Sequence, residues 1–200
     1  EKLNALEKLE LDFNQIEDIK AIYELTELKE LVLEGNQIFD IQAIERFGKL
    51  SKLNLGNNRI ENISWLDNLT QLEELYLFSN NISFLDAIAK MTRLRILDLS
   101  SNKIELFPDN NPLGNITGLQ ELYLTNNSIP DLWVIEKLTF LKILHCSSNQ
   151  IVNIESISLL TNLRELYIEQ NQINSIEPIT KLPKLENIKL SQNPISDCPP

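Results

Sequence analysis

The stretch Leu50-Ser-Lys-Leu53-Asn-Leu55-Gly-Asn-Asn58-Arg-Ile60 holds the pattern that decides the fold. Its apolar residues alternate with variable ones up to Leu55, and an asparagine follows three residues later. Alternation at every second residue is typical of a β-strand with one buried face. The asparagine stands where the chain leaves this strand. The stretch therefore predicts a short strand that ends in a turn.

The same stretch recurs along the whole chain. Its opening leucine returns every 22 residues, apart from one step of 25 residues between Leu94 and Leu119. A constant period of this length is the signature of a solenoid, in which each repeat packs only against its neighbours. We therefore expect a single domain over residues 1–200 with about nine repeats. Each repeat carries the same asparagine, at Asn14, Asn36, Asn58, Asn80, Asn102, Asn127, Asn149, Asn171 and Asn193.

These asparagines are predicted to be structural. A strand of about three to five residues cannot bury its apolar face alone, so the copies must stack at roughly 4.8 Å. At the strand end, a side-chain amide can accept a hydrogen bond from one backbone N–H and donate to carbonyls of neighbouring coils. The asparagines should therefore form a ladder that satisfies the backbone where the strands stop.

The repeat resembles the leucine-rich repeat superfamily. Its phrase L-x-x-L-x-L-x-x-N-x-I continues with apolar residues at every third position, as in Asn36-Gln-Ile38-Phe-Asp-Ile41-Gln-Ala-Ile44. This short form is similar to the repeats of the leucine-rich regulatory subunit of protein phosphatase 1 and of bacterial internalins. The resemblance implies an α/β fold, a right-handed horseshoe with a parallel β-sheet on its concave side. It also implies short 3₁₀ or irregular segments on the convex side.

Both ends of the solenoid look incomplete. Leu3 holds the position that Leu25 has in the next copy, which indicates an earlier repeat or a cap before the first residue. The last copy reaches Pro200 without a polar cap, which solenoid ends require. Asn193-Pro194 is similar to the step that opens the C-terminal cap of many intracellular family members. We expect a fragment of a longer protein, with caps or repeats missing at both ends.

The composition limits the class of partner. The formal charge is −11, from 18 basic and 29 acidic residues. Such acidity disfavours nucleic acid and anionic membranes and fits a partner with a basic or mixed surface. No apolar run approaches the 18 or so residues that a membrane span needs.

The two cysteines bear on the compartment. Cys146 takes a strand leucine position and Cys198 an isoleucine position of the tail, so both should be buried. They lie two repeats apart, roughly 10 Å by the strand spacing, which is too far for a disulfide. We expect a reduced pair in a cytoplasmic protein, with a cytoskeletal or ciliary location also compatible. The alternative is an extracellular or cell-surface location, for which the only sign is five N-x-S/T sequences that such repeats generate by chance.

The fifth repeat is three residues longer than the others. The extra length falls in Pro108-Asp-Asn-Asn-Pro112, which is rich in turn-forming residues. We expect a surface bulge away from the sheet. A secondary contact site is the alternative.

No motif for catalysis is present. His145 is the only histidine, no neighbouring residue is marked as an activated nucleophile, and the five glycines form no phosphate loop. A lone histidine beside tyrosines is also a poor metal site. The sequence predicts no enzyme, no cofactor, no metal and no small-molecule substrate.

The variable strand positions form the predicted working surface. Period two places three columns of them on the concave side, with nine acidic and three basic residues. Repeats four to eight combine aromatic and aliphatic residues with an acidic rim, which is the composition of a protein-binding hot spot. The alternative is that β-propensity alone favours tyrosine there. The predicted partner-binding residues are Glu74, Tyr76, Phe78, Ile96, Asp98, Glu121, Tyr123, Ile143, His145, Glu165, Tyr167 and Glu169.

These observations predict a protein–protein interaction module, used as a regulatory or scaffolding subunit. The resemblance implies that a phosphatase catalytic subunit is one compatible partner. An extracellular adhesin of internalin type is the first alternative. A structural spacer within a larger protein is the second.

Overall fold

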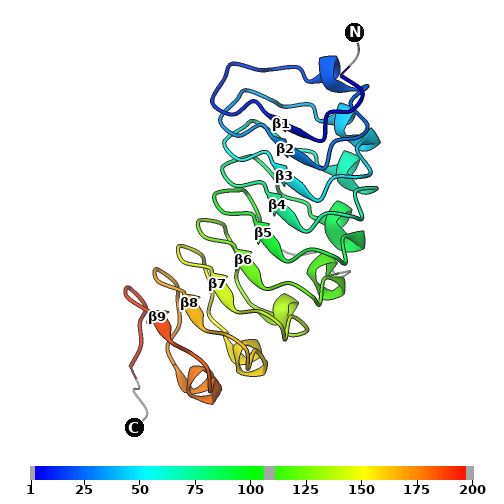
Figure 1. The fold of residues 1–200 in the computed structure, drawn as a ribbon. Helices are drawn as coiled ribbons and strands as arrows, with labels where there is room; N and C mark the ends of the chain where they lie inside the picture. Colours follow the sequence, from blue (N-terminus) through cyan, green and yellow to red (C-terminus); the bar gives the residue numbers. More distant parts are fainter. Residues whose placement is uncertain (1–2, 106–110, 197–200) are drawn as a thin grey trace.

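The computed structural model describes residues 3–105 and 111–196. Its nine strands form one parallel sheet in chain order. Each strand is three residues long, and a turn with a positive φ follows it. Figure 1 shows the strands along one face of a curved stack of coils. The strands are β1 (Lys8–Glu10), β2 (Glu30–Val32), β3 (Lys52–Asn54), β4 (Glu74–Tyr76), β5 (Ile96–Asp98), β6 (Glu121–Tyr123), β7 (Ile143–His145), β8 (Glu165–Tyr167) and β9 (Asn187–Lys189).

Short helical turns cover the opposite side of the stack (Figure 1). Every helical segment in the described residues is a 3₁₀ helix, and none is long and apolar enough to cross a membrane. The predicted horseshoe solenoid is thus confirmed. The segments are η1 (Lys20–Ile22), η2 (Gln42–Arg46), η3 (Ser64–Leu66), η4 (Asp86–Lys90), η5 (Pro112–Asn115), η6 (Trp133–Ile135), η7 (Glu155–Leu159) and η8 (Glu177–Lys181).

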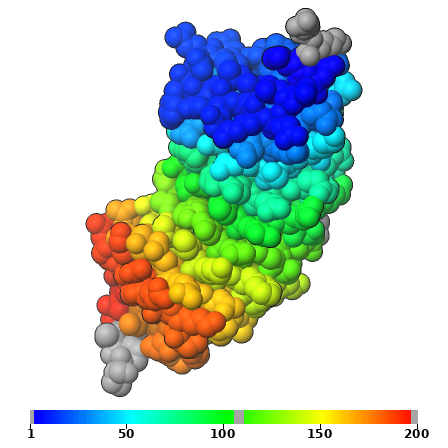
Figure 2. Space-filling model, viewed as in Figure 1, coloured from blue at the N-terminus to red at the C-terminus, as the bar shows by residue number. Residues whose placement is uncertain are grey.

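The apolar positions of the repeat build a continuous core between the sheet and the 3₁₀ turns. Leu50, Leu53, Leu55 and Ile60 of the stretch quoted above are all fully buried. The equivalent residues of neighbouring repeats extend this core along the stack. Figure 2 shows the same stack as a continuous body, with the first repeats (blue) and the last repeats (orange to red) at opposite ends.

The predicted asparagine ladder is present. Asn58 Nδ2 donates to the carbonyls of Leu55 at 3.1 Å and Gly56 at 3.1 Å in its own coil, and to Leu33 in the preceding coil at 3.0 Å. Its Oδ1 accepts from the N–H of Ile38 at 3.0 Å. One amide side chain therefore ties two coils together and satisfies backbone groups that no strand reaches.

The ladder also spans the longer fifth repeat. Asn127 Nδ2 donates to the Leu99 carbonyl at 3.0 Å, and Asn127 Oδ1 accepts from the Ile104 N–H at 3.1 Å. Across the same step Leu97 pairs with Leu122, so the sheet keeps its register. The three extra residues therefore leave the concave columns aligned.

The prediction of a surface bulge over residues 108–112 is wrong for its last residue. Residues 108–110 lie outside the described part of the chain. Pro112, which we placed in the surface bulge, is instead the first residue of η5 and is buried. Proline suits this position because its fixed φ matches a helix and its missing N–H would have no partner in the first turn.

A feature that the sequence did not reveal is the backbone just before each ladder asparagine. The residue there has a positive φ in every repeat, between 52° and 67°. Only one of these residues is a glycine, so the turn holds side chains in a conformation that they rarely adopt. The turn re-aims the chain so that the next side chain, the asparagine, points inward. The residues are Phe13, Gly35, Asn57, Ser79, Ser101, Asn126, Ser148, Gln170 and Gln192.

Cys146 is fully buried and carries a free thiol. Burial raises the pKa of this thiol, because the thiolate would lose its hydration. Its predicted burial is thus confirmed. Cys198 lies outside the described residues, so the expected absence of a disulfide stays a prediction.

Candidate functional site

The predicted columns lie side by side on the concave sheet. Tyr76 in β4 pairs with Asp98 in β5, and Asp98 pairs with Tyr123 in β6. The row continues through His145 in β7 to Tyr167 in β8. The structure therefore brings residues that are far apart in the sequence into one continuous row.

The face alternates from strand to strand. Strands β4, β6 and β8 each carry Glu-Leu-Tyr, whereas β5 carries Ile-Leu-Asp and β7 carries Ile-Leu-His. The leucine is buried, and the two flanking residues of every strand are partly buried on the concave side. As a result, Asp98 and His145 each stand between two tyrosines. The residues that flank the buried leucine thus alternate with a period of two repeats. This alternation could have been read from the sequence, but a search for a period of one repeat does not detect it.

His145 is held by its neighbours. Its ring stacks on Tyr167, with centroids 4.2 Å apart and an interplanar angle of 8°, and meets Tyr123 edge-on at 4.9 Å and 87°. Nε2 lies 2.6 Å from Glu165 Oε1. Lys189 Nζ is 4.1 Å from the centre of the Tyr167 ring, a cation–π contact. The site around His145 is therefore filled by side chains of the protein itself.

Asp98 is held differently. Its Oδ1 accepts a hydrogen bond from the Ser100 N–H at 2.9 Å. Burial raises the pKa of this carboxyl above its ordinary value of 3.8, and the hydrogen bonds from the Ser100 backbone and side chain and the charge of His145 only partly offset that effect. Among the described residues, no Lys, Arg or His nitrogen lies within 4 Å of this carboxylate. His145, two strands away, also acts on this carboxyl through its charge, but it lies beyond ion-pair distance, so Asp98 carries a partly desolvated charge without a direct ion pair.

The flanking tyrosines are anchored by glutamates of their own strands. Tyr76 OH donates to Glu74 Oε2 at 3.1 Å, and Tyr123 OH donates to Glu121 Oε2 at 2.8 Å. Burial, followed by the charge of Glu74, raises the pKa of Tyr76 to about 12. Burial and Glu121 raise the pKa of Tyr123 as well. Both hydroxyls are thus neutral donors near physiological pH, and both rings are fixed in place.

The remaining charges of the face are unevenly paired. Lys52 Nζ lies 2.7 Å from Glu74, and Lys8 contacts both Glu10 and Glu30. In contrast, Glu121 has no described cation within 4 Å and contacts only the Tyr123 hydroxyl. The uncompensated negative charge at the centre of the face is therefore concentrated on Asp98 and Glu121.

Two predicted residues, Phe78 and Glu169, follow their strands and contact the neighbouring repeat. Phe78 is partly buried, as the tyrosines of the face are, and the outer edge of its ring packs against Gly56. A Cβ at Gly56 would come within 2.4 Å of that ring, so glycine is needed there for the contact. Glu169 accepts a hydrogen bond from the Ser191 hydroxyl at 2.9 Å. Phe78 and Glu169 therefore lie at the margin of the site.

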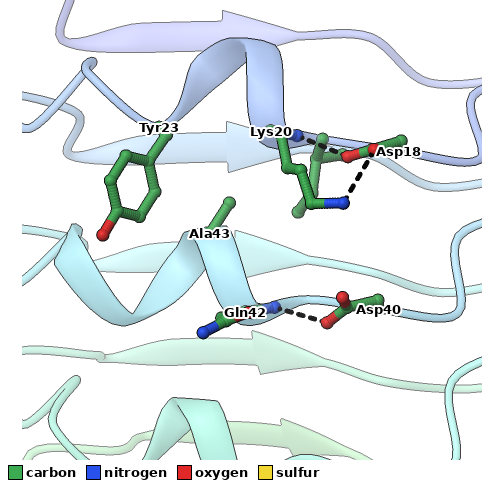
Figure 3. Close-up of a pocket in the computed structure, with 7 residues that line it drawn as sticks. Asp18, Lys20, Tyr23, Asp40, Gln42 and Ala43 are labelled. Atoms are coloured by element: carbon green, nitrogen blue, oxygen red, sulfur yellow. Dashed lines mark hydrogen bonds and ion pairs between the residues drawn. The ribbon is translucent and has the colours of Figure 1, made fainter.

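The convex side holds a pocket of about 320 Å³ between η1 and η2 (Figure 3). Its two carboxylates serve the 3₁₀ turns: Asp18 accepts from the Lys20 N–H at 2.8 Å, and Asp40 accepts from the Gln42 N–H at 2.9 Å. Lys20 Nζ also contacts Asp18, at 3.2 Å. In the described parts of the chain, no group of three or more His, Cys, Asp or Glu side chains could hold a metal ion. The concave face is thus the better candidate.

Comparison with known proteins supports the family. A family model described as leucine-rich repeats in two copies matches residues 48–85, 70–118 and 161–200, more than half of the chain. The chain belongs to the leucine-rich repeat family. No match was found among the curated proteins.

Several solved structures share the fold. Internalin C2 from Listeria monocytogenes is 28% identical with a TM-score of 0.86, over 92% of this chain and 80% of that one. A leucine-rich repeat protein of Leptospira interrogans is 33% identical with a TM-score of 0.91, over 97% of this chain and 51% of its own length. The ectodomain of the plant receptor kinase GASSHO1/SCHENGEN3 from Arabidopsis thaliana is 27% identical with a TM-score of 0.83. This chain, 95% of which is covered, spans 24% of that ectodomain, which was solved in complex with Casparian strip integrity factor 2.

These similarities confirm the predicted superfamily. Members of this family are generally protein-interaction modules rather than enzymes. The fold of this chain is consistent with such a module. None of the three structures described above is a phosphatase regulatory subunit, so the resemblance to that subgroup stays a prediction.

Proposed function

We propose that this chain is a protein-binding module whose partner docks on the concave face between β4 and β8. The observation that carries the proposal is the ordered row of Tyr76, Asp98, Tyr123, His145 and Tyr167 on an open sheet. Rings on such a face are not needed for the core, which is complete without them. Clustered tyrosines bordered by charge are typical of binding hot spots.

Rigidity supports this proposal. The tyrosine hydroxyls are hydrogen-bonded, and His145 is stacked and bound to Glu165 before any partner arrives. A partner therefore loses little affinity to the ordering of these side chains. The ladder asparagines fix the strands that carry them.

Charge defines the class of partner. The face is net negative, and the whole chain has a formal charge of −11. A protein with a basic or mixed surface would be steered toward it, whereas nucleic acid would be repelled. We propose a regulatory or scaffolding role in the cytoplasm, without a cofactor or a reaction of its own.

Affinity capture with matched variants tests this function. We expect wild-type protein to retain a partner that the variant Tyr123→Ala/Asp98→Lys loses. The control Phe140→Ala/Glu136→Lys makes the same kinds of change at exposed positions away from the concave rows. Thermal melts of both variants show whether each is folded. Equal retention by the two variants would contradict the concave-face proposal.

A second candidate is a cell-surface adhesin, because internalin C2 is among the structures that share this fold at 28% identity. The two candidates differ in location. Protease treatment of intact cells that express the full gene releases peptides of a surface protein and spares a cytoplasmic one. Release of these repeats would favour the adhesin and contradict the cytoplasmic proposal.

A further inference from the structure

Two parts of the concave face are built on one plan. The β4–β6 segment comprises Glu74, Tyr76, Ile96, Asp98, Glu121 and Tyr123. The β6–β8 segment comprises Glu121, Tyr123, Ile143, His145, Glu165 and Tyr167. In each, a central residue lies between two tyrosines and near the glutamates of the flanking strands. The segments differ in that central residue, which is Asp98 in one and His145 in the other.

The β6–β8 segment shows what the arrangement accepts. A planar nitrogen-bearing ring, that of His145, lies parallel to Tyr167 at 4.2 Å and contacts the Glu165 carboxylate at 2.6 Å through its nitrogen. The shorter side chain of Asp98 cannot reach as far from the sheet as an imidazole. Tyr76 and Tyr123 stand on the strands either side of it, roughly 10 Å apart by the strand spacing. Two stacking contacts of the 4.2 Å seen between His145 and Tyr167 add to ~8.4 Å, which fits within this strand spacing.

We propose that an arginine side chain of the protein partner occupies the β4–β6 segment, stacked between Tyr76 and Tyr123 with its guanidinium donating to Asp98 and Glu121. This inference rests on the proposed function and specifies the chemistry of the partner.

Charge complementarity selects the occupant. Asp98 and Glu121 are the central carboxylates of the face with no described cation within 4 Å. On the neighbouring strand β3, Lys52 is already engaged with Glu74 at 2.7 Å, and its Nζ lies 5.6 Å from the centre of the Tyr76 ring. The raised pKa of Asp98 is independent support, because it shows that burial makes the free carboxylate unfavourable and a cation would relieve that cost.

Shape favours arginine over lysine. A guanidinium is planar, stacks on aromatic rings and presents several N–H groups to carboxylates at once. An ammonium group would satisfy the charge but not the stacking that His145 shows in the β6–β8 segment. We therefore expect replacement of the arginine by lysine to weaken binding even though the charge is kept.

A display library of random 12-residue peptides, selected on the folded wild-type protein, provides the probe. We expect the selected peptides to share an arginine and to bind Asp98→Asn about 30-fold more weakly, because truncating one partner of a desolvated charge pair costs about 2 kcal/mol or more. The control Glu10→Gln, on β1 of the same sheet, should bind them as the wild type does. Replacing the peptide arginine by lysine should also weaken binding.

Exchanging the charges of Asp98 and the peptide arginine shows whether a loss of binding comes from the lost ion pair or from damage to the folded protein. Asp98→Arg should lose the selected peptide and regain binding when the peptide arginine is replaced by aspartate. Peptides that lack arginine, or that bind Asp98→Asn unchanged, overturn this inference. If those peptides still lose affinity for Tyr167→Ala, the proposed function stands without it. If neither Asp98→Asn nor Tyr167→Ala affects any selected peptide, both the inference and the concave-face function are wrong.

Discussion

The β4–β6 and β6–β8 segments have strands of the same length, a buried leucine at the centre of each strand and the same tyrosine spacing, yet their carboxylates are paired differently. In the β6–β8 segment, His145 and Glu165 satisfy one another at 2.6 Å. In the β4–β6 segment, Asp98 forms no ion pair within 4 Å among the described residues. A single side chain on a strand of the repeat scaffold therefore decides whether the neighbouring carboxylate is paired within the protein, as Glu165 is by His145, or is left without an ion pair, as Asp98 is.

The scaffold permits this because its own bonds do not involve these side chains. The ladder asparagines and the strand pairing use backbone groups, which are the same in every repeat. Residues on the concave columns can therefore vary without a change of register. The following predictions test whether scaffold residues and residues of the two segments contribute independently to stability, beginning with the largest effect.

Removal of one ladder amide should damage both segments together. Asn102→Ala leaves the Leu77 and Leu99 carbonyls and the Ile82 N–H without their partner. We expect a loss of about 2–4 kcal/mol in the free energy of unfolding, measured in urea. Tyr123→Ala should lose about half of that or less. The opposite ranking would mean that the face, rather than the ladder, holds the sheet.

Exchanging the central residues should interconvert the segments. His145→Asp places a new carboxylate near Glu165 and removes the ring stack, so we expect about 1–2 kcal/mol lower stability. Asp98→His should instead gain up to about 1 kcal/mol by forming a second ring between tyrosines. Thermal unfolding of the two variants shows whether each substitution lowers or raises the stability. Equal effects of the same sign would show that the segments are not equivalent.

The charge of Asp98 should destabilise the free protein at neutral pH. Because burial raises its folded-state pKa above 3.8, the stability that the protonated form provides is present below pH 3.8 and is lost as pH rises through the folded pKa. Asp98→Asn should therefore melt at a higher temperature than the wild type at pH 7. The two melting temperatures should converge near pH 3. A difference that persists at pH 3 would assign the effect to shape rather than charge.

The smallest expected effect is on the ionisation of Tyr76. Its pKa of about 12 reflects burial first and the charge of Glu74 second. Glu74→Gln should therefore lower this pKa, with little change in stability at neutral pH. The absorbance of tyrosinate during an alkaline titration follows the change, and Tyr76→Phe identifies the component that belongs to this residue. An unchanged midpoint in Glu74→Gln would show that Glu74 is not a cause, leaving burial and the charges of Glu121 and Asp98.

Much of this architecture could be predicted from the sequence. The ladder, the in-register columns and the burial of Cys146 follow from a period of 22 residues, because the backbone repeats whenever the apolar positions repeat. The positive φ before each asparagine could not be predicted for every repeat, since only Gly35, Asn57 and Asn126 are of types that favour it, whereas serine, glutamine and phenylalanine hold the position in the other repeats.

The details of the site were harder to predict. Alternation placed Tyr123, His145 and Tyr167 in one row, but it could not show which rings stack or which carboxylate His145 contacts. Those choices depend on rotamers that neighbouring side chains set together. Phe78 illustrates the point: it shares the concave side with the tyrosines, and the absence of a side chain at Gly56 lets the outer edge of its ring pack against that backbone.

The spacing of the parallel strands has a geometric consequence for whatever crosses them. An α-helix laid across the sheet advances ~5.4 Å per turn, close to the ~4.8 Å between strands. In an extended chain, residues on one side are ~6.8 Å apart. From β4 to β6, two steps, the mismatch grows to ~1.2 Å for the helix and ~4 Å for the extended chain. The row from Tyr76 to Tyr167 is thus nearly commensurate with the pitch of a helix, one turn to each strand.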